Sequence, residues 1–353
     1  MEEDRYQEVA GVSDFTRSPL NTDIENKDVN ILKLKKNAFR YSKKRGETAS
    51  RVRIPGGVID AKSMGKIVEI AEKYGTGTID ITNRQGIEIP GIKMEDMDKV
   101  NAEVQSVIDA LHINQEAEGK GFPASGTRNI EACPGARLCP FGCYDTTAFA
   151  KRIEKEIFPS DRHVKIAFTG CSNDCAKVRF ADFGIIGMTE PQYNPDRCVG
   201  CEQCIKYCKA RSVGALSLQN GKVVRDVNRC IGCGVCVHYC PTRAWTRSKD
   251  HYFRVVLMGR TGKKNPRLAE DFIRWADEES ISKMIGNVYA YIDEYIDPNA
   301  VEHKEHIGYI VDRTGFEEFL KWVMKDVHLP EKAEVASRVY WGGRPYDQPN
   351  NLK

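Results

Sequence analysis

Thirteen cysteines in 353 residues are the side chains of this sequence best suited to chemistry, and most of them stand at regular spacing. Eight fall in two runs of the pattern C-x2-C-x2-C-x3-C, the second followed by Pro241. In such runs three thiolates hold one [4Fe-4S] cube while the fourth reaches a second cube. The spacing therefore predicts two cubes, one held by Cys198, Cys201, Cys204 and Cys240 and the other by Cys230, Cys233, Cys236 and Cys208.

Structural zinc is the alternative for these runs, because zinc sites also use paired C-x2-C motifs. Two complete runs of four cysteines, with the small residues Gly200, Gly232 and Gly234 between ligands, favour cubes. Cys208 is followed by Lys209 rather than by proline, which departs from the pattern only in the local turn. Two cubes that share their ligand runs lie close together, so we expect an electron wire.

Five further cysteines precede these runs, and four of them form a C-x5-C pair and a C-x3-C pair. The second pair lies in the sequence T-G-C-S-N-D-C at residues 169–175. The paired cysteines are Cys133, Cys139, Cys171 and Cys175. Cys143 has no ligand role in this pattern, and the interpretation that we favour for it is a packed thiol, since cysteine is often buried as a small apolar residue.

A C-x5-C pair followed by a T-G-C-x-N-x-C element resembles the sirohaem-containing sulfite and nitrite reductases. The resemblance implies that Cys133, Cys139, Cys171 and Cys175 hold a third [4Fe-4S] cube, and that Cys175 also bridges to the sirohaem iron. It covers residues 30–345 approximately, with further segments in family order at residues 51–57, 82–85, 128–130, 162–165 and 259–267. In size, and in carrying a two-cluster segment, the chain most resembles the anaerobic sulfite reductases of this family.

The same resemblance implies roles for the basic and polar residues of these segments. Sulfite contacts and proton delivery are implied for Arg51, Arg128, His163 and Lys165. Contacts to the sirohaem are implied for Arg53, Thr82, Asn83, Arg84, Gln85, Asn173, Arg260, Lys263, Lys264 and Arg267, with Arg84 on the carboxylates or the anion. A surface ion pair is the alternative for any single arginine of the set.

Sulfite reduction explains why such residues would be needed. Six electrons must arrive one at a time, so the intermediates have to stay on one metal. Sulfite and the carboxylate-rich sirohaem are both anionic, and fixed guanidinium and ammonium groups compensate that charge. Where the assimilatory branch of the family usually has lysine, this chain has His163, which we expect to donate protons near neutral pH rather than to be a neutral spacer.

The helices and strands that the sequence pattern predicts around these residues indicate an α+β fold. Alternation at residues 51–54 indicates a strand, and Ser63 is placed to cap a helix with Met64, Ile67, Val68 and Ala71 on one face. A hairpin around residues 83–86 and a helix over 97–111 follow, and the next segment has a helix at 146–157 and strands at 164–168 and 183–187. The resemblance implies a sirohaem sulfite reductase-like fold, with a ferredoxin-like half, a sirohaem/[4Fe-4S] α/β domain and an inserted bacterial 2[4Fe-4S] ferredoxin domain.

Composition shifts divide the chain into five parts. We predict an N-terminal tail at 1–30, the ferredoxin-like α+β half domain at 31–115, the sirohaem/[4Fe-4S] domain at 116–190 and 250–330, the inserted ferredoxin domain at 191–249, and a C-terminal tail at 331–353. Only one R-x-P-G-G-like segment and one T-N-R-Q occur, whereas larger family members carry two copies of the half domain. We therefore expect a homo-oligomer, most simply a homodimer.

Charge and motifs narrow the class of protein. A formal net charge of +3 with 29% charged residues predicts a solvated protein and not a nucleic-acid binder. No long apolar run or signal sequence is found, so we expect a cytoplasmic protein without a membrane span. No GxGxxG or P-loop occurs, so electrons from a nicotinamide would arrive through other subunits. The resemblance implies flavin-containing and iron-sulfur donor subunits. Two alternatives to sulfite reduction are nitrite reduction to ammonia and a non-catalytic electron-transfer subunit.

Overall fold

The computed structural model divides the chain into two compact units. Unit 1 comprises residues 1–131, 150–165 and 296–306, and unit 2 comprises residues 132–149, 166–295 and 307–353. The structure describes residues 34, 37–44, 46–113, 127–158, 160, 162–262, 266–300, 305–337 and 339. The predicted N-terminal tail, Lys263 and Lys264 lie outside these described residues.

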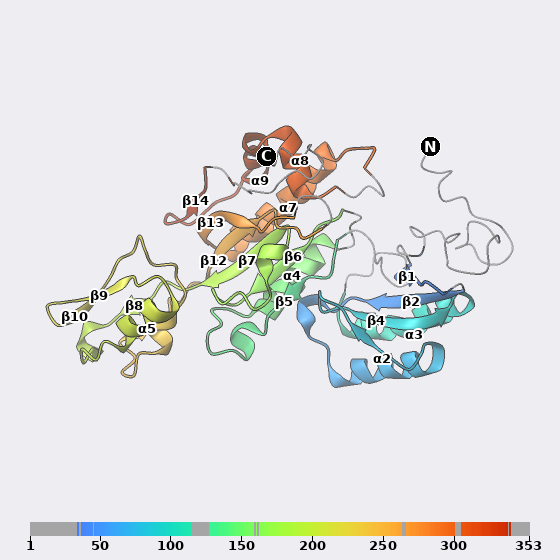
Figure 1. Ribbon diagram of the computed structural model, residues 1–353, viewed down its shortest axis with the longest axis horizontal. Coiled ribbons are helices and arrows are strands. Elements are labelled where there is room, and N and C mark those ends of the chain that lie inside the picture. Colours follow the sequence, from blue (N-terminus) through green and yellow to red (C-terminus); the bar gives the residue numbers. More distant parts are fainter. Residues whose placement is uncertain are drawn as a thin grey trace, which may run out of the picture. The chain divides into compact units, whose positions relative to one another are not determined.

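Unit 1 contains an antiparallel four-stranded sheet in the order β1-β2-β4-β3, together with two helices (Figure 1). Its elements are β1 (Phe39–Tyr41), β2 (Glu47–Val52), α2 (Ala61–Tyr74), β3 (Asp80–Ile81), β4 (Ile87–Lys93) and α3 (Met97–Ala110). Side chains of β2 alternate, with Thr48, Ser50 and Val52 buried, because successive residues of a strand face opposite sides of a sheet. The apolar sides of the sheet and of both helices form one core.

The start of α2 differs from the sequence expectation. Asp60, not Ser63, is the N-cap: its carboxylate accepts from the Ser63 backbone N–H at 2.9 Å and from the Ser63 hydroxyl at 2.6 Å. A carboxylate also suits the positive end of the helix dipole. Val68 is 39% exposed, so the buried face contains Ile67, Ile70 and Ala71 without it.

The predicted hairpin is present. β3 and β4 pair with Asp80 opposite Glu88 and Ile81 opposite Ile87. Gln85, in the turn between them, has a φ of 61°, which lies in the left-handed region that tight turns require. This turn carries the predicted 82–85 segment.

Unit 2 is built on a mixed six-stranded sheet in the order β14-β13-β12-β7-β6-β5. Its strands are β5 (Glu131–Ala132), β6 (Ile166–Thr169), β7 (Phe183–Met188), β12 (Tyr252–Leu257), β13 (Glu270–Ala276) and β14 (Glu334–Val335). β6 and β7 are parallel, while β12 is antiparallel to both β7 and β13. All six residues of β7 are buried, as expected for a central strand covered on both faces.

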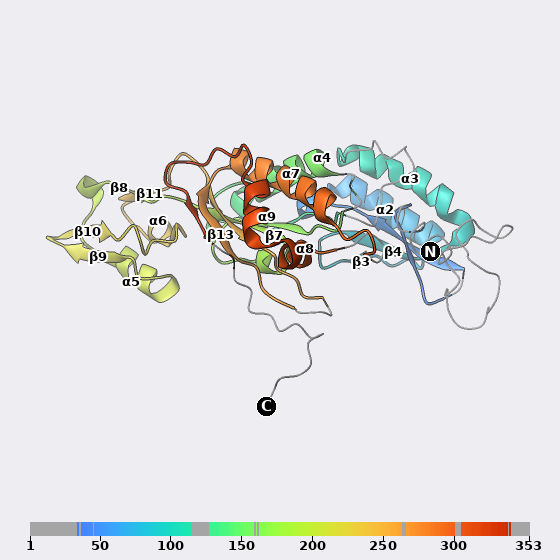
Figure 2. The ribbon, with the colours of Figure 1, turned by 90° about the horizontal axis from the view of Figure 1, so that it is seen from above.

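Four long helices accompany these strands (Figures 1 and 2). They are α4 (Thr146–Ile157), α7 (Glu278–Tyr295), α8 (Ile307–Thr314) and α9 (Phe316–Val323). The boundary between the two units falls inside α4, whose range is the one that the sequence predicts. Phe149 of α4 contacts Phe168 of β6 and Phe253 of β12, with ring centroids 4.9 and 5.5 Å apart.

Residues 191–249, which we call the cysteine-rich segment, contain only short elements. They are β8 (Gln192–Tyr193), α5 (Gln203–Arg211), β9 (Leu216–Gln219), β10 (Lys222–Arg225), α6 (Val235–His238) and β11 (Trp245–Thr246). β9 pairs with β10, and β8 with β11, so the two ends of the segment lie side by side. Its buried core consists largely of cysteines, which is what a segment organised around metal clusters instead of a large apolar core would show.

Two features were not expected from the sequence. Residues 127–131, 150–165 and 296–306, which we predicted to lie in the sirohaem/[4Fe-4S] domain, belong to unit 1. The stretch predicted as a C-terminal tail contributes β14 to the edge of the sheet, with Val335 opposite Ile273. Among the described residues, no helix is both long and apolar enough to span a membrane.

Candidate functional site

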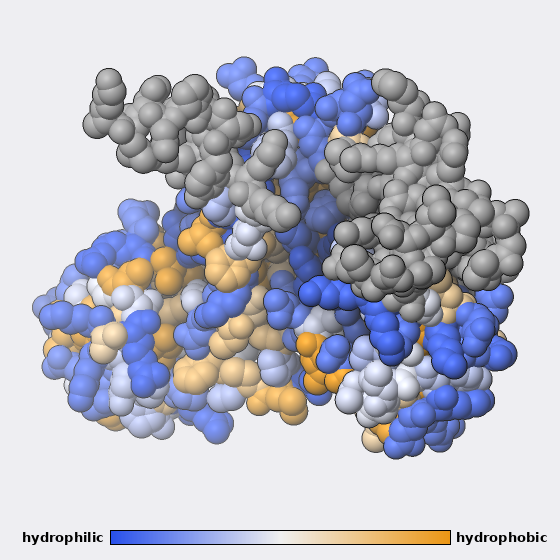
Figure 3. Space-filling view, turned by 45° about the vertical axis from the view of Figure 1, so that its right-hand side comes forward, coloured by the Kyte–Doolittle hydropathy of each residue, from blue (hydrophilic) through white to orange (hydrophobic). Residues whose placement is uncertain are grey.

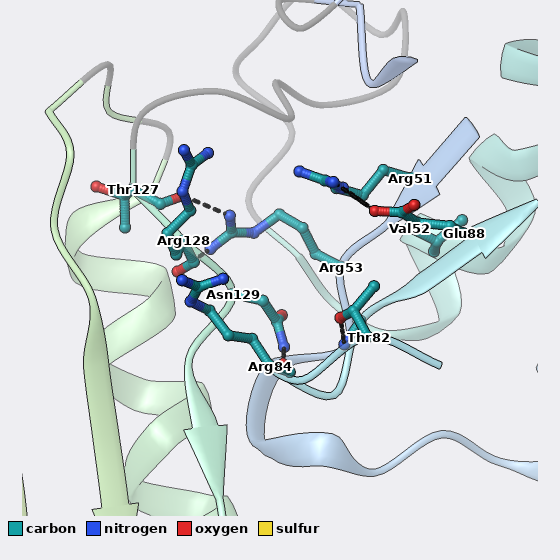
Figure 4. Close-up of a pocket in the computed structure, with 10 residues that line it drawn as sticks. Arg51, Val52, Arg53, Thr82, Arg84, Glu88, Thr127, Arg128 and Asn129 are labelled. Atoms are coloured by element: carbon teal, nitrogen blue, oxygen red, sulfur yellow. Dashed lines mark hydrogen bonds and ion pairs between the residues drawn. The ribbon is translucent and has the colours of Figure 1, made fainter. Parts of the chain in front are cut away.

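A basic pocket in unit 1 collects residues from three of the predicted segments (Figure 4). It encloses about 470 Å³, part of it open to solvent. The lining residues are Arg51, Val52, Arg53, Thr82, Arg84, Gly86, Glu88, Thr127, Arg128 and Asn129. Four arginines against one lining carboxylate make this a site suited to an anionic ligand.

Asn129 holds the pocket together. Its side-chain oxygen accepts from the Ile54 backbone N–H at 2.9 Å, and its amide nitrogen donates to the carbonyls of Ile54 at 3.0 Å and Arg84 at 2.6 Å. One side chain thus joins the end of β2, the β3–β4 turn and the segment at residues 127–130. These contacts bring Arg51, Arg84 and Arg128 to one place although they are far apart in sequence.

Glu88 of β4 positions the arginine at the end of β2. Its carboxylate accepts from Nε of Arg51 at 2.9 Å and from Nη2 of the same residue, and it also pairs with Arg40 at 2.9 Å. Arg51 stays partly exposed. The carboxylate fixes the guanidinium at the rim of the pocket, while the surplus of arginines keeps the pocket positive.

Arg53 has a different environment. It is 4% exposed, and Nε and Nη2 donate to the two carboxylate oxygens of Glu154 at 2.7 and 2.9 Å. Nη1 donates to the Thr127 carbonyl at 2.7 Å, and Nη2 also donates to the Arg128 carbonyl at 3.1 Å. The contacts shown by Arg53 hold the segment that carries Arg128, and its predicted contact with a cofactor stays a prediction.

Arg128 contacts the predicted proton donor. Nη2 of Arg128 lies 3.3 Å from Nδ1 of His163, whose ring is T-shaped against that of His306, with centroids 4.5 Å apart. Because arginine can only donate, Nδ1 of His163 accepts, and the proton of the neutral ring is on Nε2. The structure therefore brings Arg128 and His163 together, but His163 is not among the residues that line the pocket. Lys165, directly before β6, does not line it either.

The remaining residues of the β3–β4 turn have separate roles. Thr82 closes the turn, since its hydroxyl accepts from the Gly86 N–H at 3.0 Å and its N–H donates to the Gly86 carbonyl at 2.8 Å. The Gln85 side chain lies against Gly57, where an added Cβ would come within 2.6 Å of it. Asn83 is exposed and does not line the pocket.

In unit 2 the four cysteines of the C-x5-C and C-x3-C pairs share one neighbourhood. The Gly170 N–H donates to the Cys133 sulfur at 3.1 Å. Burial raises the pKa of Cys171, and the charges of Cys139, Cys133 and Cys175 raise it further. Four thiols that oppose one another's ionisation in this way suit a cationic iron core, which would bind all of them as thiolates.

Glycines allow the loops that carry these cysteines to touch. A Cβ on Gly142 would lie 2.3 Å from the Ala136 nitrogen, and one on Gly170 would lie 3.0 Å from the Gly135 Cα. The Cys139 N–H donates to the Gly135 carbonyl at 2.8 Å, and the Cys143 N–H donates to the Gly170 carbonyl at 2.7 Å. Larger side chains at these positions would push the two cysteine pairs apart.

The surroundings of the C-x3-C pair fit a bound group. The Ser172 hydroxyl is buried and has no hydrogen-bond partner among the residues that the structure describes, while Asn173 and Cys175 are exposed beside it. Among all the residues that the structure describes, no three His, Cys, Asp or Glu side chains converge closely enough to hold one metal ion. A cube of four irons is larger than a single ion, so its ligands stand further apart.

Arg260 and Arg267 form a second basic feature of unit 2. They pair through their backbones, at 2.9 and 2.8 Å, and their side chains are 1% and 7% exposed. Arg260 lies 3.4 Å from the centroid of the Tyr309 ring, and Arg267 pairs with Asp312 at 3.1 Å. Burial lowers the pKa of both guanidinium groups, and their mutual repulsion lowers that of Arg260 further. This concentration of buried positive charge suits the carboxylates of a cofactor.

Seven of the eight cysteines of the cysteine-rich segment separate into two groups by the charges that act on one another. Burial raises the pKa of Cys204, and the charges of Cys240 and Cys198 contribute to the rise. Burial likewise raises the pKa of Cys233, with contributions from Cys208 and Cys230. Cys240, the last cysteine of the second run, thus groups with cysteines of the first run, and Cys208, the last cysteine of the first run, groups with cysteines of the second.

Cys143 lies between the two cysteine regions of unit 2. Burial raises its pKa to about 12, with Arg247 opposing the rise and Cys171 and Cys233 adding to it. Arg247 donates to the Pro140 carbonyl at 2.8 Å and also to the Gly142 carbonyl. The loop before Cys143 is therefore attached to the cysteine-rich segment, and a thiol that resists ionisation agrees with the packed role expected for Cys143.

Several residues of these sites carry no signal in the sequence. Glu88, Glu154 and His306 are ordinary charged or polar residues outside the motifs, and Arg247 is one basic residue among many. Asn129 lies inside a motif, but its role depends on partners 45 and 75 residues away. Only the tertiary structure reveals them.

Comparison with known proteins identifies the family of the chain. Residues 124–331 match the nitrite and sulphite reductase 4Fe-4S domain, and residues 41–107 match the nitrite/sulfite reductase ferredoxin-like half domain. The chain is 42% identical over 320 residues to a component of the anaerobic sulfite reductase of Salmonella typhimurium, covering 89% of this chain and 94% of that protein. It is 31% identical over 274 residues to the coenzyme F420-dependent sulfite reductase of Methanocaldococcus jannaschii, covering 76% of this chain and 41% of that protein.

Solved structures show the same fold. The dissimilatory sulfite reductase I structure aligns with a TM-score of 0.61 at 17% identity, covering 78% of this chain and 69% of that one. The NirA protein of Mycobacterium tuberculosis aligns with a TM-score of 0.53 at 14% identity, covering 91% and 44%. With both domain matches in the expected order, the chain belongs to the nitrite and sulphite reductase family.

Proposed function

We propose that this chain is the catalytic subunit of a sulfite reductase, which reduces sulfite to sulfide with six electrons. The observation that carries this proposal is the convergence of Arg51, Arg84 and Arg128 on one basic pocket in a chain that also groups Cys133, Cys139, Cys171 and Cys175. The 42% identity to a component of an anaerobic sulfite reductase over 89% of the chain supports sulfite as the substrate.

The residues present fit a sirohaem coupled to a [4Fe-4S] cube. When bound, this pair would supply single electrons to a substrate held at its iron. Cys133, Cys139, Cys171 and Cys175 would hold the cube, and Cys175 would also contact the sirohaem. Arg260 and Arg267 would bind haem carboxylates, with Asn173, Lys263 and Lys264 as further predicted contacts.

The basic residues of unit 1 would handle the anion and the protons. Arg51, Arg84 and Arg128 would bind sulfite through charge-assisted hydrogen bonds, which strengthen as charge develops on the departing oxygens. His163 in its protonated form and Lys165 would supply protons so that these oxygens leave as water. Arg53 would keep Arg128 in place through the two backbone carbonyls that it binds.

The cysteine-rich segment would act as an electron relay with two further cubes. The two electrostatic groups of thiols support the crossed assignment, in which Cys240 joins Cys198, Cys201 and Cys204, and Cys208 joins Cys230, Cys233 and Cys236. The single copy of the half domain supports a homo-oligomer. Flavin-containing and iron-sulfur subunits would deliver the electrons, since no nucleotide-binding motif occurs in this chain.

Turnover of two anions with one artificial donor tests this function. With reduced methyl viologen as donor, anaerobically purified holoprotein should consume six viologens per sulfite, release sulfide, and show a higher kcat/KM for sulfite than for nitrite. Arg128→Gln should lower kcat/KM for sulfite by about 10²-fold, the usual cost of removing one preorganised donor. The matched change Arg152→Gln, on the exposed side of α4, should have little effect.

Two results would contradict the proposal. A preference for nitrite would make the chain a nitrite reductase. Reduction of the clusters without turnover of either anion would make it an electron-transfer subunit.

A further inference from the structure

The cysteine-rich segment differs in charge from the rest of the chain. It contains ten Lys and Arg against three Asp and Glu, whereas the other residues contain 43 against 47. Two oxidised cubes, each about −2, would leave the segment positive. Within the described part of the chain, Arg225 is the one of these ten that forms an ion pair, with Glu190 at 3.3 Å. Most of the positive charge of the segment therefore faces solvent.

The segment has an inner side, which faces the four-cysteine group of unit 2. Arg247 binds the loop that carries Cys139 and Cys143, and the His238 ring lies 4.2 Å from that of Phe141 in the same loop. Cys233 also lies close enough to Cys143 for their charges to interact. The cysteines of the second group, with α6, thus stand next to the predicted catalytic cube, and electrons would leave the segment there.

The segment also has an outer edge, formed by the loop after Arg197 and the β9–β10 hairpin (Figure 2). Val199 is 70% exposed between two predicted cube ligands, and Cys201 is exposed as well. Nζ of Lys222 binds the Pro195 carbonyl at 2.7 Å, which holds the hairpin against this loop. We call Arg197, Val199, Cys201, Lys206 and Lys222 the entry edge. All five are exposed, and the three basic residues surround an apolar and a cysteine side chain.

Figure 3 shows hydrophobic residues interspersed with hydrophilic ones over the left-hand part of the surface, where the cysteine-rich segment lies. A small apolar contact within a charged rim is common in transient complexes of electron-transfer proteins, which bind weakly and dissociate quickly. A positive rim speeds the encounter with a negative partner and slows that with a positive one.

We propose that the entry edge docks an acidic one-electron carrier protein, and that electrons enter the chain at the cube of Cys198, Cys201, Cys204 and Cys240. In each encounter one electron leaves the carrier, which is oxidised, and reduces this cube, with no proton or group transferred. The inference rests on the proposed relay and adds its direction and the chemistry of the donor.

Charge reversal at the entry edge tests the docking site in holoprotein with matched iron content. The test variant is the double change Lys206→Glu and Lys222→Glu. The control is the double change Lys283→Glu and Lys325→Glu, which changes the net charge by the same amount. Both of these lysines are exposed residues of unit 2 outside the segment. The donor is a reduced acidic ferredoxin, and the readout without sulfite is the second-order rate of cluster bleaching in a stopped-flow instrument. Anisotropy of a labelled oxidised ferredoxin reports binding.

We expect the test variant to lower the ferredoxin rate and affinity by about tenfold, and the wild-type rate to fall as salt is added. The control variant should match wild type, and reduced methyl viologen, a cation, should bleach the clusters of the test variant at least as fast as those of wild type. A test variant that keeps the wild-type ferredoxin rate, or a control that loses as much, would overturn the proposal. Because sulfite is absent, failure of the proposed sulfite chemistry would leave this result unaffected.

Discussion

Arg51 and Arg53 show how one motif can contain two different functions. They are the same residue type two positions apart, and the resemblance implies a contact with the anion for Arg51 and with the cofactor for Arg53. In the structure, Arg51 lies at the rim of the basic pocket, whereas Arg53 is buried against Glu154, a residue 101 positions away. Burying a charge requires a well-placed counter-charge, and that partner is not visible in the local sequence. The sequence identified the motif but not the buried pairing of Arg53 with Glu154.

His163 carries the residue-scale prediction. As a general acid His163 would donate from its protonated ring, and the neutral ring left behind accepts from Arg128 through Nδ1. Removal of a general acid typically costs 10²-fold or more. His163→Asn should lower viologen-driven sulfite turnover by about 10²-fold and remove the decline of activity at rising pH that a histidine acid produces.

His306→Asn is the control for this prediction. It removes the ring that contacts His163 but keeps the hydrogen bond to Arg128, so the loss should be only a few-fold. Full turnover of His163→Asn across the neutral pH range would refute the proton-donor role.

At the scale of elements, periodicity predicted those helices and strands whose own residues determine them. α3 and α4 have regular apolar faces, and β7 is a continuous apolar run. β1 and β14 were missed because they contain only three and two residues, which is too few to show a periodic pattern. Both strands form only by pairing with a neighbouring strand. The N-cap was assigned to Ser63 although Asp60 serves, since several polar residues near a helix start are equivalent in sequence.

The pair of helices in unit 1 gives a pH prediction. Glu103 of α3 accepts from Lys73 at 2.6 Å and Tyr74 at 2.8 Å, both at the end of α2, and Lys73 chiefly lowers its pKa to about 2. Because the folded pKa lies below the unfolded value of about 4.3, this stabilisation is full above that value and is lost as pH falls toward 2. The pair is partly exposed, so we expect Glu103→Gln to cost about 1 kcal/mol of local stability at pH 7.

Amide hydrogen exchange of α3, compared at matched pH, measures this effect. The difference between wild type and Glu103→Gln should narrow as pH falls from about 5 toward 2. Glu72→Gln, on the exposed side of α2, is the control and should leave exchange unchanged. If the difference in exchange between wild type and Glu103→Gln stayed constant with pH, the charge of the Glu103 carboxylate would not be the source of the stabilisation.

At the scale of the whole molecule, the sequence predicted the chemistry better than the boundaries. Cysteine spacing predicts ligand groups because the geometry of a cube restricts that spacing directly. Residues 150–165 and 296–306 join unit 1 through contacts such as Arg53 with Glu154 and His163 with His306, which no local pattern announces. Charge balance over 353 residues likewise conceals the basic cysteine-rich segment, because the remaining residues are slightly acidic.

The central claim is that one chain carries sirohaem and three [4Fe-4S] cubes. Iron and acid-labile sulfide counts, with an absorption spectrum of anaerobically purified protein, test it most directly. The account predicts about thirteen irons and about twelve sulfides per chain, together with the absorption bands of sirohaem. About eight irons without sirohaem bands would contradict it, because such a protein would have the relay but no catalytic centre.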